Sequence, residues 1–414
     1  MFGSVNPCKA AAGRGAARGT HGGVWAVTFF AASVLGTFTR AAAQEEPAGG
    51  AVEPPAATYW VYVGAESADL IHRVRFGPDG AAVEKTIPVG LYPTEMEGPH
   101  GLAISADGKY LHMTTGHGLP DGQYWKIELG PDTVVGEPIM LGRFPATVDV
   151  TPDGLYAFVV NFNLHGDHVP SDVSVIYTPD VVEVARVTTC TMPHGSRLDA
   201  TGMVQYSACM MDDQIVELDT RTFEVSRRFS VAAGAEGPVP VTHTAAAAAN
   251  EAGGHASAMA HGGHEPTCSP TWAQPDPTRA RLYVACNAGD EVLEIDTEKW
   301  TLLRRFATGR GPYNLAVTRD GGTLVATLKQ GAGVELIDLE TGTTRARLES
   351  STKVTHGVAV TPDSRYAFVS VEGIGAEPGK VDIFDLHAMR QVGSVDVGQQ
   401  AGGIAFWKME PANP

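Results

Sequence analysis

The sequence has few helix signals and lacks several common catalytic motifs, and each shortage excludes a class of protein. Helical periodicity is nearly absent outside the first 43 residues, which excludes the βαβ units that bind dinucleotides. The chain also contains no G-x-S-x-G elbow, no P-loop and no H-E-x-x-H segment. The sequence therefore does not decide whether the protein is an enzyme.

Basic residues and cysteines are also scarce. Only 30 Lys and Arg residues stand against 47 Asp and Glu residues, a formal net charge of −17. Because an acidic surface repels phosphate backbones, no nucleic-acid partner is expected. The chain has five cysteines, one of which lies in the N-terminal segment.

The N-terminal segment has the parts of an export signal. Basic residues precede a mostly apolar run at 24–38, and three alanines at 41–43 offer a cleavage site. The sequence predicts a signal peptide at 1–43, with an uncleaved anchor as the alternative, and a Pro/Ala/Glu-rich disordered linker at 44–57. We therefore expect a periplasmic or secreted protein with no membrane span in its mature chain.

What the sequence does contain is a repeat of β-strand signals. Similar inner-strand segments begin near His100, Ala146, Tyr313 and His356, and the intervals from His100 to Ala146 and from Tyr313 to His356 are 46 and 43 residues. A period of roughly 40–50 residues with four strand-like runs is typical of a β-propeller. The repeats predict an all-β propeller domain over 58–408, followed by a tail at 409–414.

The strand count predicts seven blades. Three strands near the N-terminus, at 59–63, 70–76 and 83–89, have no inner strand before them, and a lone inner strand at 402–406 ends the repeats. Joining these four strands would complete the seventh blade, close the ring and leave no exposed sheet edge there.

Short turn motifs carry a resemblance to a known family. The sequence resembles the YVTN-repeat propellers, exported bacterial relatives of the WD40 class, over about residues 59–408. The motifs are Ser105-Ala106-Asp107-Gly108, Thr151-Pro152-Asp153-Gly154, Thr361-Pro362-Asp363-Ser364 and Tyr283-Val284-Ala285-Cys286. The resemblance implies the architecture but not the function, since such propellers include enzymes, cofactor carriers and binding scaffolds.

Alignment of the repeats predicts a metal site at one mouth of the channel. The residues at the equivalent position are His100, Ala146, His194, Thr271, Tyr313, His356 and Ala401. The three histidines fall in blades two, four and seven, an almost even triangle around a seven-blade ring. Neutral imidazoles that converge on one axis suit copper or zinc. Three unrelated histidines, hydrogen-bonded in a water-filled channel, are the alternative.

Further candidate ligands lie on the same predicted face. His117, His165 and His168 follow second strands, and a long insertion at 234–267 resembles a soft-metal loop that could cover the site or deliver metal. The ligand types of that insertion are His243, His255, Met259, His261 and His264. Glu372 and Tyr313 are candidates to orient the metal-binding imidazoles. An ordinary surface loop and a solvated carboxylate are the alternatives for the insertion and for Glu372.

The arrangement is also similar to the propellers of nitrous-oxide reductase and of d1-haem nitrite reductases, in which histidines on one face meet a cofactor. The sequence has no cupredoxin domain and no Cys-x-x-Cys-His haem motif. Neither activity is carried over to this chain.

The four remaining cysteines form two pairs with similar spacing. Cys190 and Cys209 are 19 residues apart, and Cys268 and Cys286 are 18 apart. Four cysteines allow three connectivities, and the repeated spacing favours bridges 190–209 and 268–286 in an oxidising compartment. Thiolate ligation of a metal beside His194 is the alternative.

Three functions remain open. The first is a propeller that binds copper or zinc, with possible redox chemistry. The second is a metal-free scaffold that binds a protein or a surface polymer on the channel-mouth face. The third is a lactonase-like hydrolase of a small molecule, with channel histidines as acid and base.

Overall fold

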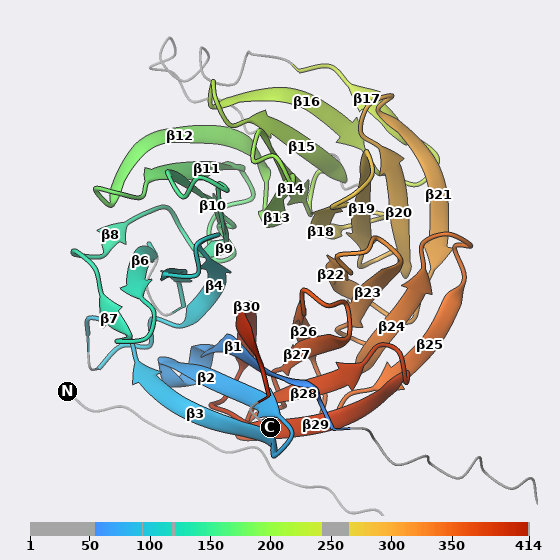
Figure 1. Ribbon diagram of the computed structural model, residues 1–414. Helices are drawn as coiled ribbons and strands as arrows, with labels where there is room; N and C mark the ends of the chain where they lie inside the picture. Colours follow the sequence, from blue (N-terminus) through green and yellow to red (C-terminus); the bar gives the residue numbers. More distant parts are fainter. Residues whose placement is uncertain (1–53, 93, 118–120, 242–264, 413–414) are drawn as a thin grey trace, which may run out of the picture. The chain divides into compact units, whose positions relative to one another are not determined.

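Seven antiparallel sheets surround a central channel in the computed structural model, which describes residues 54–92, 94–117, 121–241 and 265–412 (Figure 1). The described residues form one compact unit. Helical structure in the described ranges is limited to one 3-10 turn, η1 (Glu66–Ala68). No helix of the described chain is long and apolar enough to span a membrane. The predicted all-β, seven-bladed propeller is confirmed.

Each blade runs from an inner strand at the channel to an outer strand at the rim. Blade one consists of β30 (Ala401–Pro411), β1 (Ala57–Ala65), β2 (Leu70–Gly77) and β3 (Gly80–Pro88). Blade two consists of β4 (Pro99–Ile104), β5 (Tyr110–Thr115), β6 (Gln123–Glu128), β7 (Thr133–Val134) and β8 (Ile139–Met140). Blade three consists of β9 (Pro145–Val150), β10 (Tyr156–Asn161), β11 (Pro170–Tyr177) and β12 (Val182–Thr191).

Blade four carries a short fifth strand at its outer edge. Blade four consists of β13 (Pro193–Leu198), β14 (Val204–Cys209), β15 (Gln214–Asp219), β16 (Glu224–Ser230) and β17 (Gly237–Val239), and blade five of β18 (Pro270–Pro275), β19 (Arg281–Cys286), β20 (Glu291–Asp296) and β21 (Thr301–Ala307). Blade six consists of β22 (Pro312–Val317), β23 (Thr323–Leu328), β24 (Gly333–Asp338) and β25 (Thr344–Glu349). Blade seven consists of β26 (Thr355–Val360), β27 (Tyr366–Val371), β28 (Lys380–Asp385) and β29 (Arg390–Asp396).

The ring closes as the strand count predicts. Strand β30 pairs antiparallel with β1, with Val61 opposite Phe406 and Val63 opposite Ile404. The inner strands also contact one another in a closed circuit, because β30 packs against both β4 and β26 (Figure 1). The C-terminal strand therefore completes blade one and covers the inner edge of β1.

Both ends of the predicted domain are wrong by a few residues. Strand β30 continues to Pro411, which pairs with Ala57 at the start of β1. Residues 409–411 therefore belong to the sheet and not to a tail, and Ala57 belongs to β1 and not to the linker. The sequence pattern did not predict this extension, because residues such as Lys408 and Glu410 are polar. Backbone pairing with β1 continues the strand beyond its apolar residues.

The turn motifs and the strand patterns have simple physical causes. In the Thr151-Pro152-Asp153-Gly154 turn, the Asp153 carboxylate accepts hydrogen bonds from the Thr151 hydroxyl at 2.6 Å and the Leu155 amide at 3.0 Å. Second strands such as β10 are buried almost throughout because neighbouring blades cover both of their faces. Outer strands such as β25 instead alternate between exposed and half-buried residues.

Both predicted disulfides are present. Cys190 is bonded to Cys209 and Cys268 to Cys286, with Cα separations of 5.9 and 4.4 Å. Each bridge joins the approach to an inner strand with the end of the next strand. Such a loop contributes ~3 kcal/mol to stability in the chain-entropy account of disulfides.

Part of the predicted insertion at 234–267 is a strand and not a loop. Strand β17 pairs with β16, placing Arg228 opposite Val239, so backbone hydrogen bonds order a stretch with no apolar alternation. His243, His255, Met259, His261 and His264 lie outside the described residues, as do the predicted signal peptide and most of the linker.

A buried histidine in blade two should make stability depend on pH. The pKa of His112 is lowered to about 3, first by burial and then by the Lys126 ammonium, against an opposing effect of Asp107. The unfolded chain takes up a proton at this imidazole below about pH 6.5, whereas the folded chain does not until about pH 3. This contribution to stability is therefore lost as the pH falls through that window.

We expect His112→Gln to flatten the acid side of the stability profile. The wild type should lose about 2 kcal/mol more than the variant between about pH 6.5 and 4.5. Urea unfolding at a series of pH values measures the difference. Parallel profiles for the two proteins would contradict the assignment.

Candidate functional site

The inner-strand residues predicted to share the channel mouth do occupy equivalent positions. His100, His194 and His356 are each the second residue of their strands, β4, β13 and β26. All three are buried, with exposed fractions of 7%, 2% and 4%. The repeat alignment therefore placed these side chains correctly.

The three imidazoles converge. The ring centroid of His100 lies 6.3 Å from that of His194 and 5.6 Å from that of His356. Tyr313 fills the remaining side of the cluster, with its ring 5.3 Å from His194 and 4.8 Å from His356. The cluster thus draws residues from four different blades to one point.

Backbone carbonyls of the next blade fix how two of the rings are protonated. The Nδ1 atom of His100 lies 2.7 Å from the Ala146 carbonyl oxygen, and that of His194 lies 2.9 Å from the Thr271 oxygen. A carbonyl oxygen can only accept, so each Nδ1 donates, and the lone pair of the neutral ring is on Nε2. The Nε2 of His194 accepts a hydrogen bond from the Tyr313 hydroxyl at 3.0 Å.

His356 is the exception among the three. Its Nδ1 is buried and has no hydrogen-bond partner in the described structure. The backbone of Gly402 lies near this ring and opposes the lowering of its pKa by burial. This ring is therefore the least restrained of the three.

Burial keeps the three imidazoles neutral. It lowers the pKa of His194 to about 3 and lowers the pKa values of His100 and His356 as well. The Lys329 ammonium acts in the same direction on all three. At neutral pH the rings can donate electron pairs to a metal without first losing a proton.

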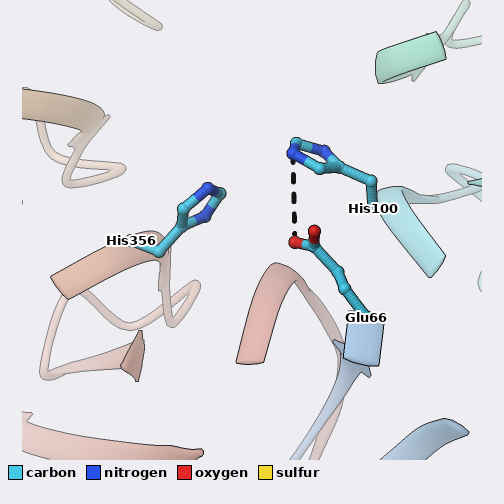
Figure 2. A group of neighbouring side chains, drawn as sticks. All are labelled: Glu66, His100 and His356. Atoms are coloured by element: carbon cyan, nitrogen blue, oxygen red, sulfur yellow. Dashed lines mark ion pairs between the residues drawn. The ribbon is translucent and has the colours of Figure 1, made fainter. Parts of the chain in front are cut away.

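A second ring of polar residues follows the second strands of the blades. Glu66 opens the η1 turn directly after β1, and its exposed fraction is 2%. Its Oε1 lies 3.9 Å from His100 Nε2, and its Oε2 forms an ion-pair contact with His117. Figure 2 shows Glu66, His100 and His356 directed into the same space.

Two further members of this ring are paired with each other. The Lys329 Nζ lies 3.0 Å from Glu372 Oε1 and 4.2 Å from the centre of the Tyr313 ring. The same Glu372 oxygen is 3.8 Å from His356 Nε2, which is longer than a hydrogen bond. The Lys329–Glu372 pair thus borders the histidine cluster.

Neighbouring charges set the ionisation of Glu66 and Lys329. Burial by itself raises the pKa of Glu66, but the neighbouring His100, His117 and Lys329 outweigh it, so the pKa is lowered and the carboxylate is charged. For Lys329 the surrounding Tyr313, Glu372 and Glu66 outweigh burial and raise its pKa. Glu66 therefore presents a charged carboxylate beside the imidazoles, a group that can attract a cation.

Glu66, His100 and His356 together have the composition of a metal site. One ligand atom of each lies within 4.8 Å of the others. Ligand atoms of a tetrahedral zinc site, with bonds of about 2.0–2.2 Å, are about 3.3–3.6 Å apart. Inward rotation of the side chains by about 1 Å would close that gap, so these residues fit a metal ion.

The other predicted ligands have different surroundings. His117 joins the cluster through Glu66 and lies with its ring 6.0 Å from that of His100. His165 is exposed and contacts Phe144 with ring centroids 5.9 Å apart, and His168 is exposed. His194 lies in the cluster, but its Nε2 is engaged by Tyr313.

Sequence reasoning missed Glu66 and Lys329. Both directly follow the second strand of a blade, as Glu372 does in blade seven. The same repeat alignment would have found them if every blade had been read at that position. Their charges instead resembled those of ordinary loop residues.

Comparisons with known proteins support the fold only. No family profile matches the chain, and no curated protein matches it. Among solved structures, hydrazine synthase of Kuenenia stuttgartiensis has a TM-score of 0.56 and 18% identity, covering 75% of this chain and 90% of that chain. A functionally unknown protein of Desulfotomaculum acetoxidans has a TM-score of 0.60 and 16% identity, covering 84% and 98%. At these identities the likeness establishes the seven-bladed β-propeller fold and no activity.

Proposed function

We propose that this protein is an exported β-propeller that holds a divalent transition metal at its channel mouth. Glu66, His100 and His356 are the proposed ligands. The observation that carries the proposal is the approach of three buried ligand atoms, from three different blades, to within 4.8 Å of one another. Buried polar groups gathered in this way are costly to a fold unless they are paired or bind an ion.

The ligand set narrows the choice of metal. Two imidazoles and one carboxylate, with a coordination position left open, are typical of catalytic zinc sites and also of non-haem iron sites. Zinc is our first expectation, and copper, which the histidines alone suggested, is the second. A bound zinc would supply Lewis acidity and would activate a water molecule.

The neighbouring residues of the chain would support such a site. The Tyr313 hydroxyl holds His194 in place, and the carboxylate of Glu372 lies beside His356. Lys329 places an ammonium group next to both Tyr313 and Glu372. We propose that this cation helps to bind an anionic group of a small-molecule ligand near the metal.

Export and family membership form part of the same proposal. Two disulfides indicate an oxidising compartment, in agreement with the predicted signal peptide. Membership of the YVTN-repeat propellers accounts for the turn motifs. A periplasmic or secreted location is the simplest reading of both features.

A metal-free hydrolase is less well supported. General acid–base catalysis is most effective when the pKa of the catalytic group is near the working pH. Burial lowers the pKa of His194 to about 3 and that of His100 below its ordinary value, so neither ring readily takes up a proton at neutral pH. A metal-free scaffold is the reading that remains if no metal binds.

Elemental analysis of the full chain, produced without a His-tag, tests the proposal. Chelator-treated protein is titrated with Zn²⁺, Cu²⁺ and Fe²⁺ in separate experiments. We expect one ion per chain for the preferred metal and a more than ~100-fold weaker affinity in Glu66→Gln, which keeps the shape of the side chain but removes its charge.

The control is His168→Ala, which removes an exposed histidine and should leave the affinity unchanged. Failure of all three ions to bind at a stoichiometric site would refute the metal centre. Equal binding by Glu66→Gln and the wild type would remove Glu66 from it.

A further inference from the structure

Next to the histidine cluster the central channel contains a small, partly open cavity of about 20 Å³. His100 and His356 line one part of it. Arg197, Trp272 and Asn314 line another part, and none of these three belongs to the proposed metal site. The polar groups of this second set are not explained by the fold.

Arg197 is a cation with unused donors. It lies on inner strand β13, three residues after His194, and is half-buried. The guanidinium stacks on the Trp272 ring, with its central carbon 4.5 Å from the ring centre. Its one hydrogen bond within the described chain runs from Nη1 to the Ser196 carbonyl at 3.0 Å. The edge formed by Nε and Nη2 is therefore free to donate.

The residues beside Arg197 also carry unpaired polar atoms. The exposed fraction of Trp272 is 4%, and its Nε1 is buried without a hydrogen-bond partner in the described structure. Asn314 is 5% exposed, and its Oδ1 is likewise unpaired there. Since an Asn amide can be turned by 180°, this residue can present either a donor or an acceptor. Buried polar atoms are rarely left unpaired, so a ligand is a physical explanation for this group.

No carboxylate of the described residues forms an ion pair with the Arg197 guanidinium. The nearest acidic influence on Arg197 is Asp149, but the two residues form no ion pair. The carboxylate of Asp149 is occupied by the backbone amides of Leu198 at 2.8 Å and Val150 at 3.0 Å. Burial lowers the pKa of Arg197, and the charge of Asp149 opposes this effect.

We propose that the channel of this protein binds a small carboxylate between Arg197 and Trp272. The free Nε–Nη2 edge of a guanidinium matches the two oxygens of a carboxylate, and the stacked Trp272 ring keeps that edge in place. The indole N–H of Trp272 and the amide of Asn314 supply further polar contacts in the same cavity. The site recognises an anion and is thus distinct in chemistry from the cation site above it.

The proposal does not depend on a metal at the channel mouth. Arg197, Trp272 and Asn314 are placed by the inner strands of blades four, five and six, whether or not an ion occupies Glu66, His100 and His356. The two proposals can therefore fail separately.

The test is calorimetric titration of the chelator-treated full chain with formate and acetate, and with chloride and sulfate for comparison. We expect saturable binding of one carboxylate per chain. Arg197→Gln should weaken carboxylate binding at least ~10-fold, because the charged guanidinium and its paired N–H donors are lost. Trp272→Phe, which keeps the stacking ring but removes the N–H, should weaken it several-fold. Arg319→Gln removes an exposed arginine and serves as the matched control.

Arg197→Lys is a second variant that distinguishes loss of binding from a folding defect. It keeps the positive charge but lacks the paired N–H donors of the guanidinium. Binding that is weakened in a folded Arg197→Lys protein supports the proposal. Unchanged binding in Arg197→Gln overturns it, and so does chloride binding as tight as that of formate and acetate. Carboxylate binding that appears only after metal is restored would assign the anion to the metal and would also overturn it.

Discussion

Deletion of residues 400–414 is expected to prevent the protein from folding to a soluble monomer. The deletion removes β30, the inner strand of blade one, and leaves the inner edge of β1 without a partner. It also breaks the ring of inner strands, since β30 packs between β4 and β26. Exposed strand edges pair with other chains, so aggregation is the expected outcome, measured by size-exclusion chromatography of freshly expressed protein.

A milder change tests the same idea in folded protein. Ile404 is buried in the core that blade one shares with blade seven, and Ile404→Ala should cost about 2–4 kcal/mol of the free energy of unfolding. Deletion of residues 412–414 alone, beyond β30, should have little effect and is the control. A soluble monomer with wild-type melting after removal of residues 400–414 would show that closure by β30 is not required.

His356→Ala should weaken metal binding far more than His194→Ala does. His356 belongs to the group whose ligand atoms approach within 4.8 Å, whereas the Nε2 of His194 is occupied by the Tyr313 hydroxyl. Loss of a ligand should reduce the affinity by more than about 100-fold, because second-sphere changes alone reduce it by about 10–100-fold. His194→Ala should reduce it by about 10-fold, through loss of packing around His100.

Competition with a chromophoric chelator measures these affinities, and circular dichroism and melting confirm that each variant is folded. The pair of variants distinguishes two ligand sets. Equal losses in His194→Ala and His356→Ala, together with an unchanged Glu66→Gln, would identify the three histidines as the ligands. A large loss in Glu66→Gln and His356→Ala, with a small one in His194→Ala, supports the set that includes the carboxylate.

The repeats made much of the architecture predictable. Strand signals recur with a period of 43–46 residues between clear copies, and the three-plus-one count of terminal strands predicted closure by β30. The cysteine pairs were also predictable, because two neighbouring blades repeat the same spacing. A repeat provides several readings of one pattern, so errors at single positions matter little.

Strand ends and single charged residues were harder to predict. The extension of β30 to Pro411 depends on backbone pairing with β1. Strand β17 likewise forms by backbone pairing with β16, the outer strand beside it. Neither stretch has an apolar pattern of its own. Glu66 follows a strand that was identified, but its charge by itself did not distinguish a buried site residue from a solvated one.

The sequence by itself determined the fold class, the number of blades, the disulfides and the placement of His100, His194 and His356 at one mouth. These features follow from the period of the sequence repeats and from the alternating direction of the strands within each blade. Only the tertiary structure decided that Glu66 meets His100 and His356, that Tyr313 engages His194, and that Arg197 stacks on Trp272. Those contacts join residues of different blades, and their distances depend on how the ring packs, which no local pattern specifies.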